Sequence, residues 1–282
     1  MLKQRVITAL VLLAVLLPAL FYSDPLPFRV IVLIAITAGT WEWGQLNGLH
    51  GASALTTAVI GLLAGLCTWW LGWLDKSLPI LWLVASIAWV LGSVALLRTG
   101  SSGWHKIPIP LRWCSGMLAL WVAGVAIVQA HHIGINFLLS VLLLVWVADI
   151  FAYFSGRAFG LRFTKTKLAP SISPGKTWEG VWGGALAVML LASVWVWADM
   201  TYQVQIPSLY SHIYQKGWWW LVVMALFMTA MNVVGDLLES LVKRSAGVKD
   251  SSQLLPGHGG VLDRIDAMLP VLPLAMMLVT WF

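Results

Sequence analysis

Long blocks of apolar residues occupy most of this 282-residue chain, and they constrain its fold more than any other feature. A helix of about 20 apolar residues crosses the hydrocarbon core of a bilayer, and it satisfies its own backbone polar groups there. The alternating segments of about ten residues that mark a membrane β-barrel are not found in the sequence. The sequence therefore predicts an all-α, polytopic integral membrane protein.

The composition agrees with a membrane protein. Hydrophobic residues make up 60% of the chain and charged residues 10%, whereas soluble domains carry roughly 25% charged residues. The net charge of +6 raises the alternative of a nucleic-acid partner, but basic cytoplasmic loops explain it more simply. We therefore expect the lipid bilayer as a partner and no nucleic acid.

The apolar blocks divide into about nine candidate transmembrane helices. Pro270 and Pro273 interrupt the last block, so eight spans followed by a re-entrant end is the alternative. The nine blocks lie at about residues 6–22, 28–46, 54–73, 79–97, 113–130, 137–156, 180–198, 218–239 and 265–282.

The distribution of basic residues predicts the orientation of these helices. With nine spans and a cytoplasmic N-terminus, which places Lys3 and Arg5 inside, all but three of the 17 basic residues fall on the inner side. Such a bias is what the positive-inside rule predicts. Two long loops rich in Gly, Pro, Ser and basic residues, 157–179 and 240–264, also fall on the inner side, and loops of this kind often carry function.

Five of the eleven acidic residues lie within the C-terminal charged stretch, residues 236–266. Asp236, Glu239 and Lys243 share one face of a helix, and Asp263 and Asp266 share another. Ionisable groups inside a span are costly and are usually functional. Gathered carboxylates without nitrogen or sulfur ligands suit a hard cation such as Mg²⁺.

The same stretch contains features that suit phosphate. The glycines of the segment Pro-Gly-His-Gly-Gly, residues 256–260, can present backbone N–H groups to anionic oxygens, although this pattern alone is weakly specific. Lysines and arginines beside carboxylates complete a pattern typical of metal plus polyphosphate. A set of solvated ion pairs at helix ends is the structural alternative.

Two further segments extend the candidate site. Asp149 is a second acidic residue inside a predicted span, although a lone acid there can also bond a neighbouring helix. The segment 167–180 contains Ser173 and Lys176 in a Ser-Pro-Gly-Lys turn that can bind phosphate. We expect the site at the junction of the sixth, eighth and ninth spans.

The segment from Ser240 to Asp266, here called the signature segment, resembles the signature of the phosphatidate cytidylyltransferase family, also called CDP-diglyceride synthase. That signature runs S-x-x-K-R, four residues, K-D, and then P-x-H-G-G-x-x-D-R-x-D, and every fixed position is present. The segment 149–180 is also similar to the family, so the resemblance covers about residues 149–282 well. Residues 1–135 match only as a set of spans.

The resemblance implies transfer of CMP from CTP to phosphatidic acid, which gives CDP-diacylglycerol and pyrophosphate. It implies a multi-pass protein of the bacterial inner membrane whose active site faces the cytoplasm. Catalytic roles are expected for charged residues and one histidine: Asp236, Lys243, Lys249, Asp250, His258 and Asp263. Substrate contacts are expected from residues able to bind phosphate: Ser173, Lys176, Ser240, Arg244, Gly259, Gly260 and Arg264.

The expected cofactor is Mg²⁺, with a second divalent ion or a monovalent ion such as K⁺ as alternative companions. Its expected ligands are carboxylates: Asp149, Asp236, Asp263 and Asp266. We divide the chain into an N-terminal transmembrane scaffold of about five helices, residues 1–135, and a catalytic region, residues 136–282. A homodimer is the alternative to a monomer.

Two other functions are alternatives to cytidylyl transfer. A CTP-dependent polyprenol or phytol kinase resembles this sequence in its C-terminal region, but it would transfer the γ-phosphate to an alcohol and need a base. A secondary transporter could use intramembrane acids to carry protons or Na⁺. Transporters are typically built from repeated halves with sites near the midplane, whereas the charges here crowd at one membrane face in one half.

Overall fold

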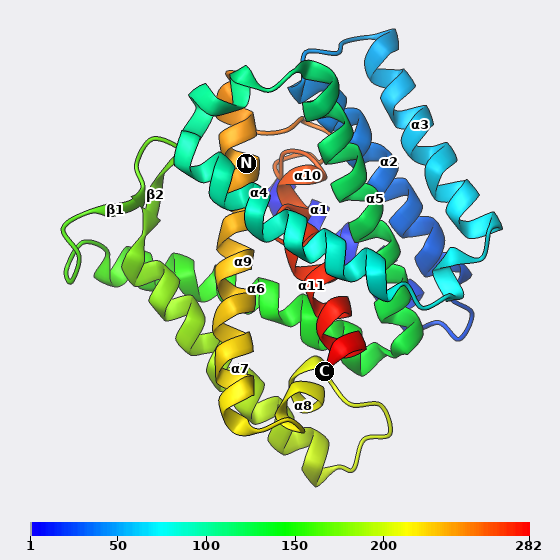
Figure 1. The fold of residues 1–282 in the computed structure, drawn as a ribbon, viewed down its shortest axis with the longest axis vertical. Helices are drawn as coiled ribbons and strands as arrows, with labels where there is room; N and C mark the ends of the chain where they lie inside the picture. The colour runs from blue at the N-terminus through cyan, green and yellow to red at the C-terminus, as the bar shows by residue number, and fades with distance from the viewer. Residues whose placement is uncertain (1) are drawn as a thin grey trace.

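A computed structural model describes residues 2–282, although not the side chains of Leu2, Lys3 and Arg5. Lys3 and Arg5, which the orientation argument counts on the inner side, therefore lie outside the described side chains. Nine helices follow the nine apolar blocks (Figure 1): α1 Leu2–Phe21, α2 Leu26–Leu46, α3 Ala52–Trp70, α4 Pro79–Lys106, α5 Ile109–Ile133, α6 Ile135–Phe159, α7 Trp178–Thr201, α9 Trp218–Ser245 and α11 Met268–Trp281.

Seven of these helices, α2 to α7 and α9, are long and apolar enough to cross a membrane. The prediction of a mostly helical, multi-pass membrane protein is therefore confirmed. The shorter elements lie between the long helices: η1 Trp73–Asp75, β1 Lys167–Ala169, β2 Ser173–Thr177, α8 Leu209–Tyr214 and α10 Leu262–Ile265.

Several helix ends differ from the predicted spans; α5 begins at Ile109 rather than 113, and α9 continues to Ser245 rather than 239. The last helix begins at Met268 rather than at residue 265 and is only 14 residues long, because the turn of α10 precedes it. Helix α4 extends to Lys106 rather than 97, with a kink at Gly100, whose φ of 64° departs from helical geometry. The loop 157–179 contains an antiparallel hairpin of β1 and β2, an exception to the all-α prediction.

Helices α6 and α7 pack closely because glycines line the contact. A Cβ on Gly180 or Gly184 would lie 2.8 Å from a backbone oxygen of α6, that of Ala152 or Ala148 respectively. Small residues allow the backbones of membrane helices to approach in this way. The close packing fixes the hairpin, which directly precedes α7, relative to α6.

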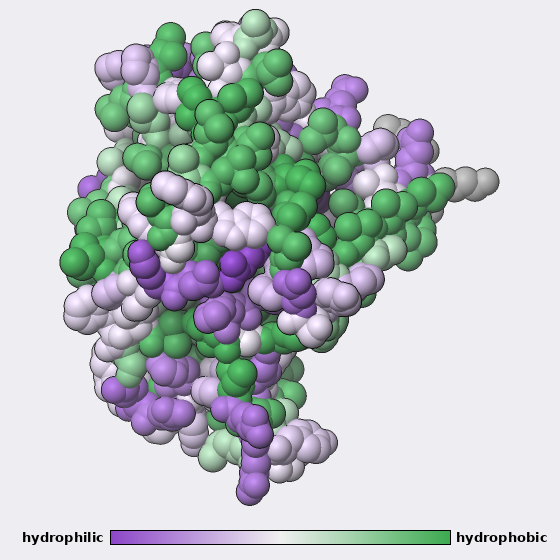
Figure 2. All heavy atoms as spheres, turned by 90° about the vertical axis from the view of Figure 1, so that its right-hand side faces the viewer, coloured by the Kyte–Doolittle hydropathy of each residue, from purple (hydrophilic) through white to green (hydrophobic). Residues whose placement is uncertain are grey.

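Helices from both halves of the chain form the core. Helix α5 packs against α2 and α11, and α4 packs against α9 and α11. Most of α11 is buried. The outer surfaces of the long helices remain apolar, and Figure 2 shows hydrophobic residues covering much of one face, with hydrophilic residues gathered in patches.

Candidate active site

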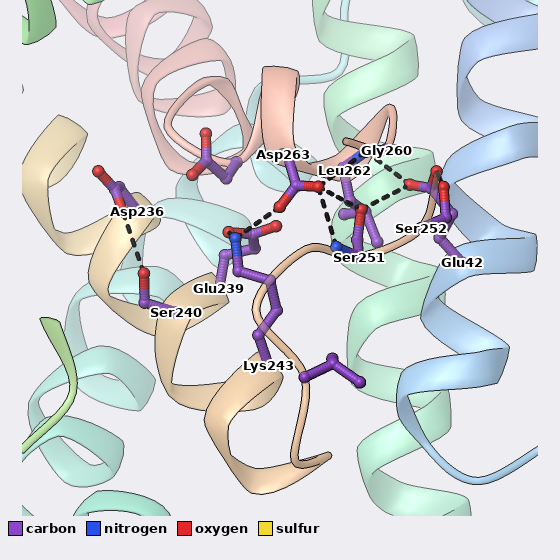
Figure 3. Close-up of polar contacts among 12 residues, drawn as sticks. Glu42, Asp236, Glu239, Ser240, Lys243, Ser251, Ser252, Gly260, Leu262 and Asp263 are labelled. Carbon is purple, nitrogen blue, oxygen red and sulfur yellow. Dashed lines mark hydrogen bonds and ion pairs between the residues drawn. The ribbon is translucent and has the colours of Figure 1, made fainter. Parts of the chain in front are cut away.

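Helix α9 carries four polar side chains of the candidate site near its C-terminal end: Asp236, Glu239, Ser240 and Lys243 (Figure 3). An apolar run from Trp218 builds the helix, and it ends at Ser245, just before Gly247 with a φ of 73°. A positive φ costs glycine little, so the chain can turn sharply there. The turn directs the following segment back toward α9.

Lys243 lies between two carboxylates. Its ammonium forms ion pairs with Glu239, one turn earlier on α9, and with Asp263 of α10, whose oxygen lies 2.5 Å away. The side chains of both acids are only 4% exposed, so these charges interact in surroundings that screen them poorly. Removing Lys243 alone would leave two buried carboxylates without their cation.

Asp263 accepts four hydrogen bonds. Beyond Lys243, its Oδ2 accepts from the N–H of Ser251 at 2.9 Å, from the hydroxyl of Ser251 at 3.0 Å and from the N–H of Gly260 at 2.8 Å. Burial acts to raise the pKa of Asp263, but the bonds from Lys243, Gly260 and Ser251 outweigh it and lower the pKa to about 2. Asp263 therefore stays ionised and ties the segment 251–260 to α9.

The Pro-Gly-His-Gly-Gly segment forms a tight turn. The N–H of His258 donates to the carbonyl of Leu255, and Leu255 forms an isolated antiparallel bridge with Gly259. Gly257 and Gly259 have φ values of 75° and 80°, a backbone conformation that residues with a side chain rarely adopt. The Nδ1 of His258 is buried without a hydrogen-bond partner among the described residues.

A residue that the sequence analysis missed holds this turn from the other half of the chain. Glu42 of α2 is fully buried and accepts from the N–H of Val261 at 2.9 Å and of Leu262 at 2.7 Å. It also accepts from the hydroxyls of Ser252 at 2.6 Å and Ser251 at 3.2 Å. Four donors thus satisfy this buried charge.

The sequence did contain a signal for Glu42. It is the only acidic residue in the predicted span 28–46, and the rule that such acids are usually functional applies to it as it does to Asp149. Figure 3 shows contacts running from Lys243 through Asp263 and Ser251 to Glu42, with Asp236 to the left of that series. A Cβ on Gly260 would lie 2.4 Å from Glu42, so only glycine fits there.

The structure brings the segment 167–180 against α9. The ammonium of Lys176, on β2, lies 2.6 Å from Asp236, whose other oxygen accepts a bond of 3.3 Å from Ser240. Both side chains of the ion pair are partly exposed, so a ligand can reach them. Buried Glu179, at the start of α7, accepts from Phe163 and Thr164 and so fixes the chain before the hairpin.

Asp149 and Asp266 complete the acidic cluster. Asp149 of α6 accepts a hydrogen bond of 2.7 Å from the side chain of Asn232 on α9. Asp266 follows α10 and lies within electrostatic reach of Asp236 and Asp149. Among the described residues, no three acidic, histidine or cysteine side chains lie close enough together to hold a metal ion alone.

The remaining predicted residues lie on the periphery of the cluster. Arg244, Lys249 and Arg264 are exposed and, within the described residues, form no ion pair. Asp250 is exposed as well, and Ser173 is partly exposed on β2. The site thus combines a buried, paired centre with a rim of unpaired cations, an arrangement suited to an anionic ligand.

Comparison with known proteins identifies the family of this chain. The model described as "Cytidylyltransferase family" matches residues 3–282, nearly the whole chain. This chain belongs to the cytidylyltransferase family. The match includes both segments that the structure joins at Lys176 and Asp236, as well as the N-terminal helices that the sequence analysis matched only as generic spans.

Two curated relatives are similar over nearly their full length, and a third is similar over about half of its length. A phosphatidate cytidylyltransferase of Haemophilus influenzae is 38% identical, covering 97% of this chain and 96% of that protein. One from Pseudomonas aeruginosa is 37% identical, covering 97% and 95%. One from Bacillus subtilis is 38% identical over 53% of this chain and 49% of its own length. The predicted family resemblance is confirmed.

Proposed function

We propose that this chain is a CTP:phosphatidate cytidylyltransferase, which transfers CMP from CTP to phosphatidate and yields CDP-diacylglycerol and pyrophosphate. One observation carries the proposal: relatives named phosphatidate cytidylyltransferase match 97% of the chain at 37–38% identity. The Lys176–Asp236 ion pair supports it, because it holds the segment 149–180 against α9, the helix that leads into the signature segment.

In this reaction a phosphate oxygen of phosphatidate forms a bond to the α-phosphorus of CTP. The bond from that phosphorus to the oxygen leading to the β-phosphorus breaks, and pyrophosphate leaves with the electron pair. Both reactants are anions, so their repulsion must be offset. We assign this role to Lys176 and to the exposed cations Arg244, Lys249 and Arg264. The attacking phosphate is already ionised, so His258 is assigned to orienting a phosphate rather than to acting as a base.

We also propose Mg²⁺ as the cofactor. Magnesium usually takes one or two carboxylates together with substrate phosphates and water rather than a cage of protein ligands. Asp236, with Asp149 and Asp266 in electrostatic reach, suits this role, whereas the oxygens of Asp263 already accept four hydrogen bonds. When bound, the ion would neutralise triphosphate charge. A second divalent ion or K⁺ remains an alternative companion.

For the membrane arrangement we propose nine spans with a cytoplasmic N-terminus, in a bacterial inner membrane. The positive-inside bias supports this orientation. The substrates support it as well, because CTP is a cytosolic solute and the headgroup of phosphatidate lies at the membrane surface. The active site would then face the cytoplasm and the inner leaflet.

One assay tests the proposed activity. Purified protein in mixed micelles receives radiolabelled CTP, phosphatidate and Mg²⁺, and we expect labelled CDP-diacylglycerol together with pyrophosphate. Chelation by EDTA should stop the reaction, and added Mg²⁺ should restore it. Labelling of an alcohol acceptor only, from γ-labelled CTP, would indicate a kinase instead. Activity that persists in EDTA would remove the metal from the proposal.

A further inference from the structure

A cavity of about 350 Å³ lies between α2, α4, α5 and α9. Its lining is almost entirely apolar, and small residues on α4 and α5 leave the space open. Protein interiors contain few voids larger than a water molecule, and an empty cavity lowers stability. A cavity of this size among membrane-spanning helices therefore needs an apolar occupant. The small lining residues include Ala85, Ala88, Gly92, Gly116 and Ala119.

The cavity shares a wall with the candidate active site. Glu239 and Leu262 both line it. Glu239 forms the ion pair with Lys243, and Leu262 directly precedes Asp263 and donates its N–H to Glu42. A molecule in the cavity would therefore contact the same side chains and backbone that hold the polar cluster in place.

The cavity opens sideways between α4 and α5. These helices follow each other in the chain, yet they have little direct contact. Residues at the opening are exposed in the isolated chain, with Leu118 of α5 60% exposed and Ala88 of α4 also exposed. In a bilayer this opening faces lipid, so a lipid tail can enter it without crossing water.

Size and charge narrow the choice of occupant. A volume of about 350 Å³ suits a single slender acyl chain better than an α-helix, which is about 10–12 Å across with its side chains. The guanidinium of Arg112 lies 5.8 Å from the ring centre of Trp104, a cavity residue, so positive charge stands beside the cavity. That charge favours an anionic lipid over a neutral one.

We propose that this cavity binds an acyl chain of the phosphatidate substrate while its headgroup reacts at the polar cluster. The inference rests on the proposed function. It assigns to the N-terminal half of the chain, through α4 and α5, a part in holding the lipid substrate.

Gly92 provides a sharp test, because a Cβ built there meets no atom within 4 Å. Gly92→Phe should place an aromatic ring in the cavity, because Gly92 forms part of the cavity wall. We expect the KM for long-chain phosphatidate to rise about tenfold, because the excluded part of the acyl chain loses its packing contacts with the cavity wall. The KM for dihexanoyl phosphatidate and for CTP should stay unchanged. Leu91→Phe, on the exposed face of the same helix, is the matched control and should change neither.

Equal effects of Gly92→Phe on both lipids, or no effect on either, would overturn the proposal. A second measurement does not depend on turnover. Phosphatidate with a diazirine near the end of one acyl chain should crosslink to residues of α4, α5 or α9 that line the cavity, and Gly92→Phe should abolish the crosslink. If the enzyme is active but the crosslinks form only outside the cavity, the acyl-chain site is overturned and the proposed function is not. Absence of CDP-diacylglycerol from the wild-type protein would instead overturn the proposed function.

Discussion

At the scale of single residues, Glu42 is the residue whose hydrogen bonds most clearly link the two halves of the chain. A carboxylate accepts at both oxygens, whereas the amide of glutamine accepts at only one and would direct an N–H₂ group toward a donor. Glu42→Gln should therefore lose at least one bond to Val261 or Leu262 and leave a buried group unsatisfied. The cost is about 1–3 kcal/mol.

Because those bonds hold the turn that carries Asp263, we expect kcat of Glu42→Gln to fall about tenfold or more in protein that remains folded. Asp199→Asn is the matched control. Asp199 is also buried, and it accepts from Asn136, Ser208 and Ser211 near the opposite end of α7. It should lose comparable thermal stability but keep its kcat. An unchanged kcat for Glu42→Gln would show that Glu42 does not position the site.

At the scale of elements, the hairpin of β1 and β2 is held to α9 through one ion pair among the described residues. Lys176→Met removes the partner of Asp236 and a proposed phosphate contact. We expect kcat/KM for CTP to fall at least about tenfold, since charge-assisted bonds to phosphate contribute roughly 1.5–3 kcal/mol. Lys167→Met, exposed on the other strand, should retain its activity. An equal loss of kcat/KM in both variants would mean that the total positive charge of the hairpin matters, rather than the Lys176–Asp236 ion pair.

His212 of helix α8 should make the stability of the protein depend on pH. Burial lowers the pKa of His212, and the nearby charge of Lys216 lowers it further, while a bond to the carbonyl of Val279 acts in the opposite direction. The folded-state pKa thus lies below the unfolded value of about 6.5. The contribution of neutral His212 to stability is complete above that value and is lost as the pH falls toward the folded-state pKa.

Thermal unfolding in detergent between pH 8 and pH 5 measures this effect. The wild-type protein should lose melting temperature toward pH 5, and His212→Gln should lose less. His50→Gln, at an exposed loop position, should follow the wild type. A decline in His212→Gln as steep as that of the wild type would assign the pH dependence to other groups.

At the scale of the whole molecule, the orientation in the membrane can be mapped by cysteine labelling. In a background lacking Cys67 and Cys114, single cysteines at exposed positions in loops or near the end of α4 report the side. Cysteines at Ser102, Thr166 and Gln253 should react with an impermeant maleimide only after the inner membrane is opened, and one at Gln203 should react in intact spheroplasts. Reaction of Thr166 and Gln203 from the same side would contradict the proposed nine spans.

The class of fold, the approximate position of each long helix and the family could all be predicted from the amino-acid sequence. Long apolar blocks leave the backbone no alternative to helix in lipid, and the signature segment is read directly along the chain. The ends of helices were less predictable. A local turn shortened the last span to begin at Met268, and the loop before α7 formed a hairpin.

Which distant residues share the site became clear only from the packing of the helices. Pairing of Lys176 with Asp236, and of Glu42 with the turn at Val261, joins residues 60 or more positions apart, and no local periodicity encodes such contacts. Likewise the cavity between α2, α4, α5 and α9 arises from how these helices pack, because the small residues of one helix do not reveal which residues of another helix face them. A buried charge requires a partner, but the sequence does not show which residue that is. The packing of whole helices determines which residue lies beside the charge.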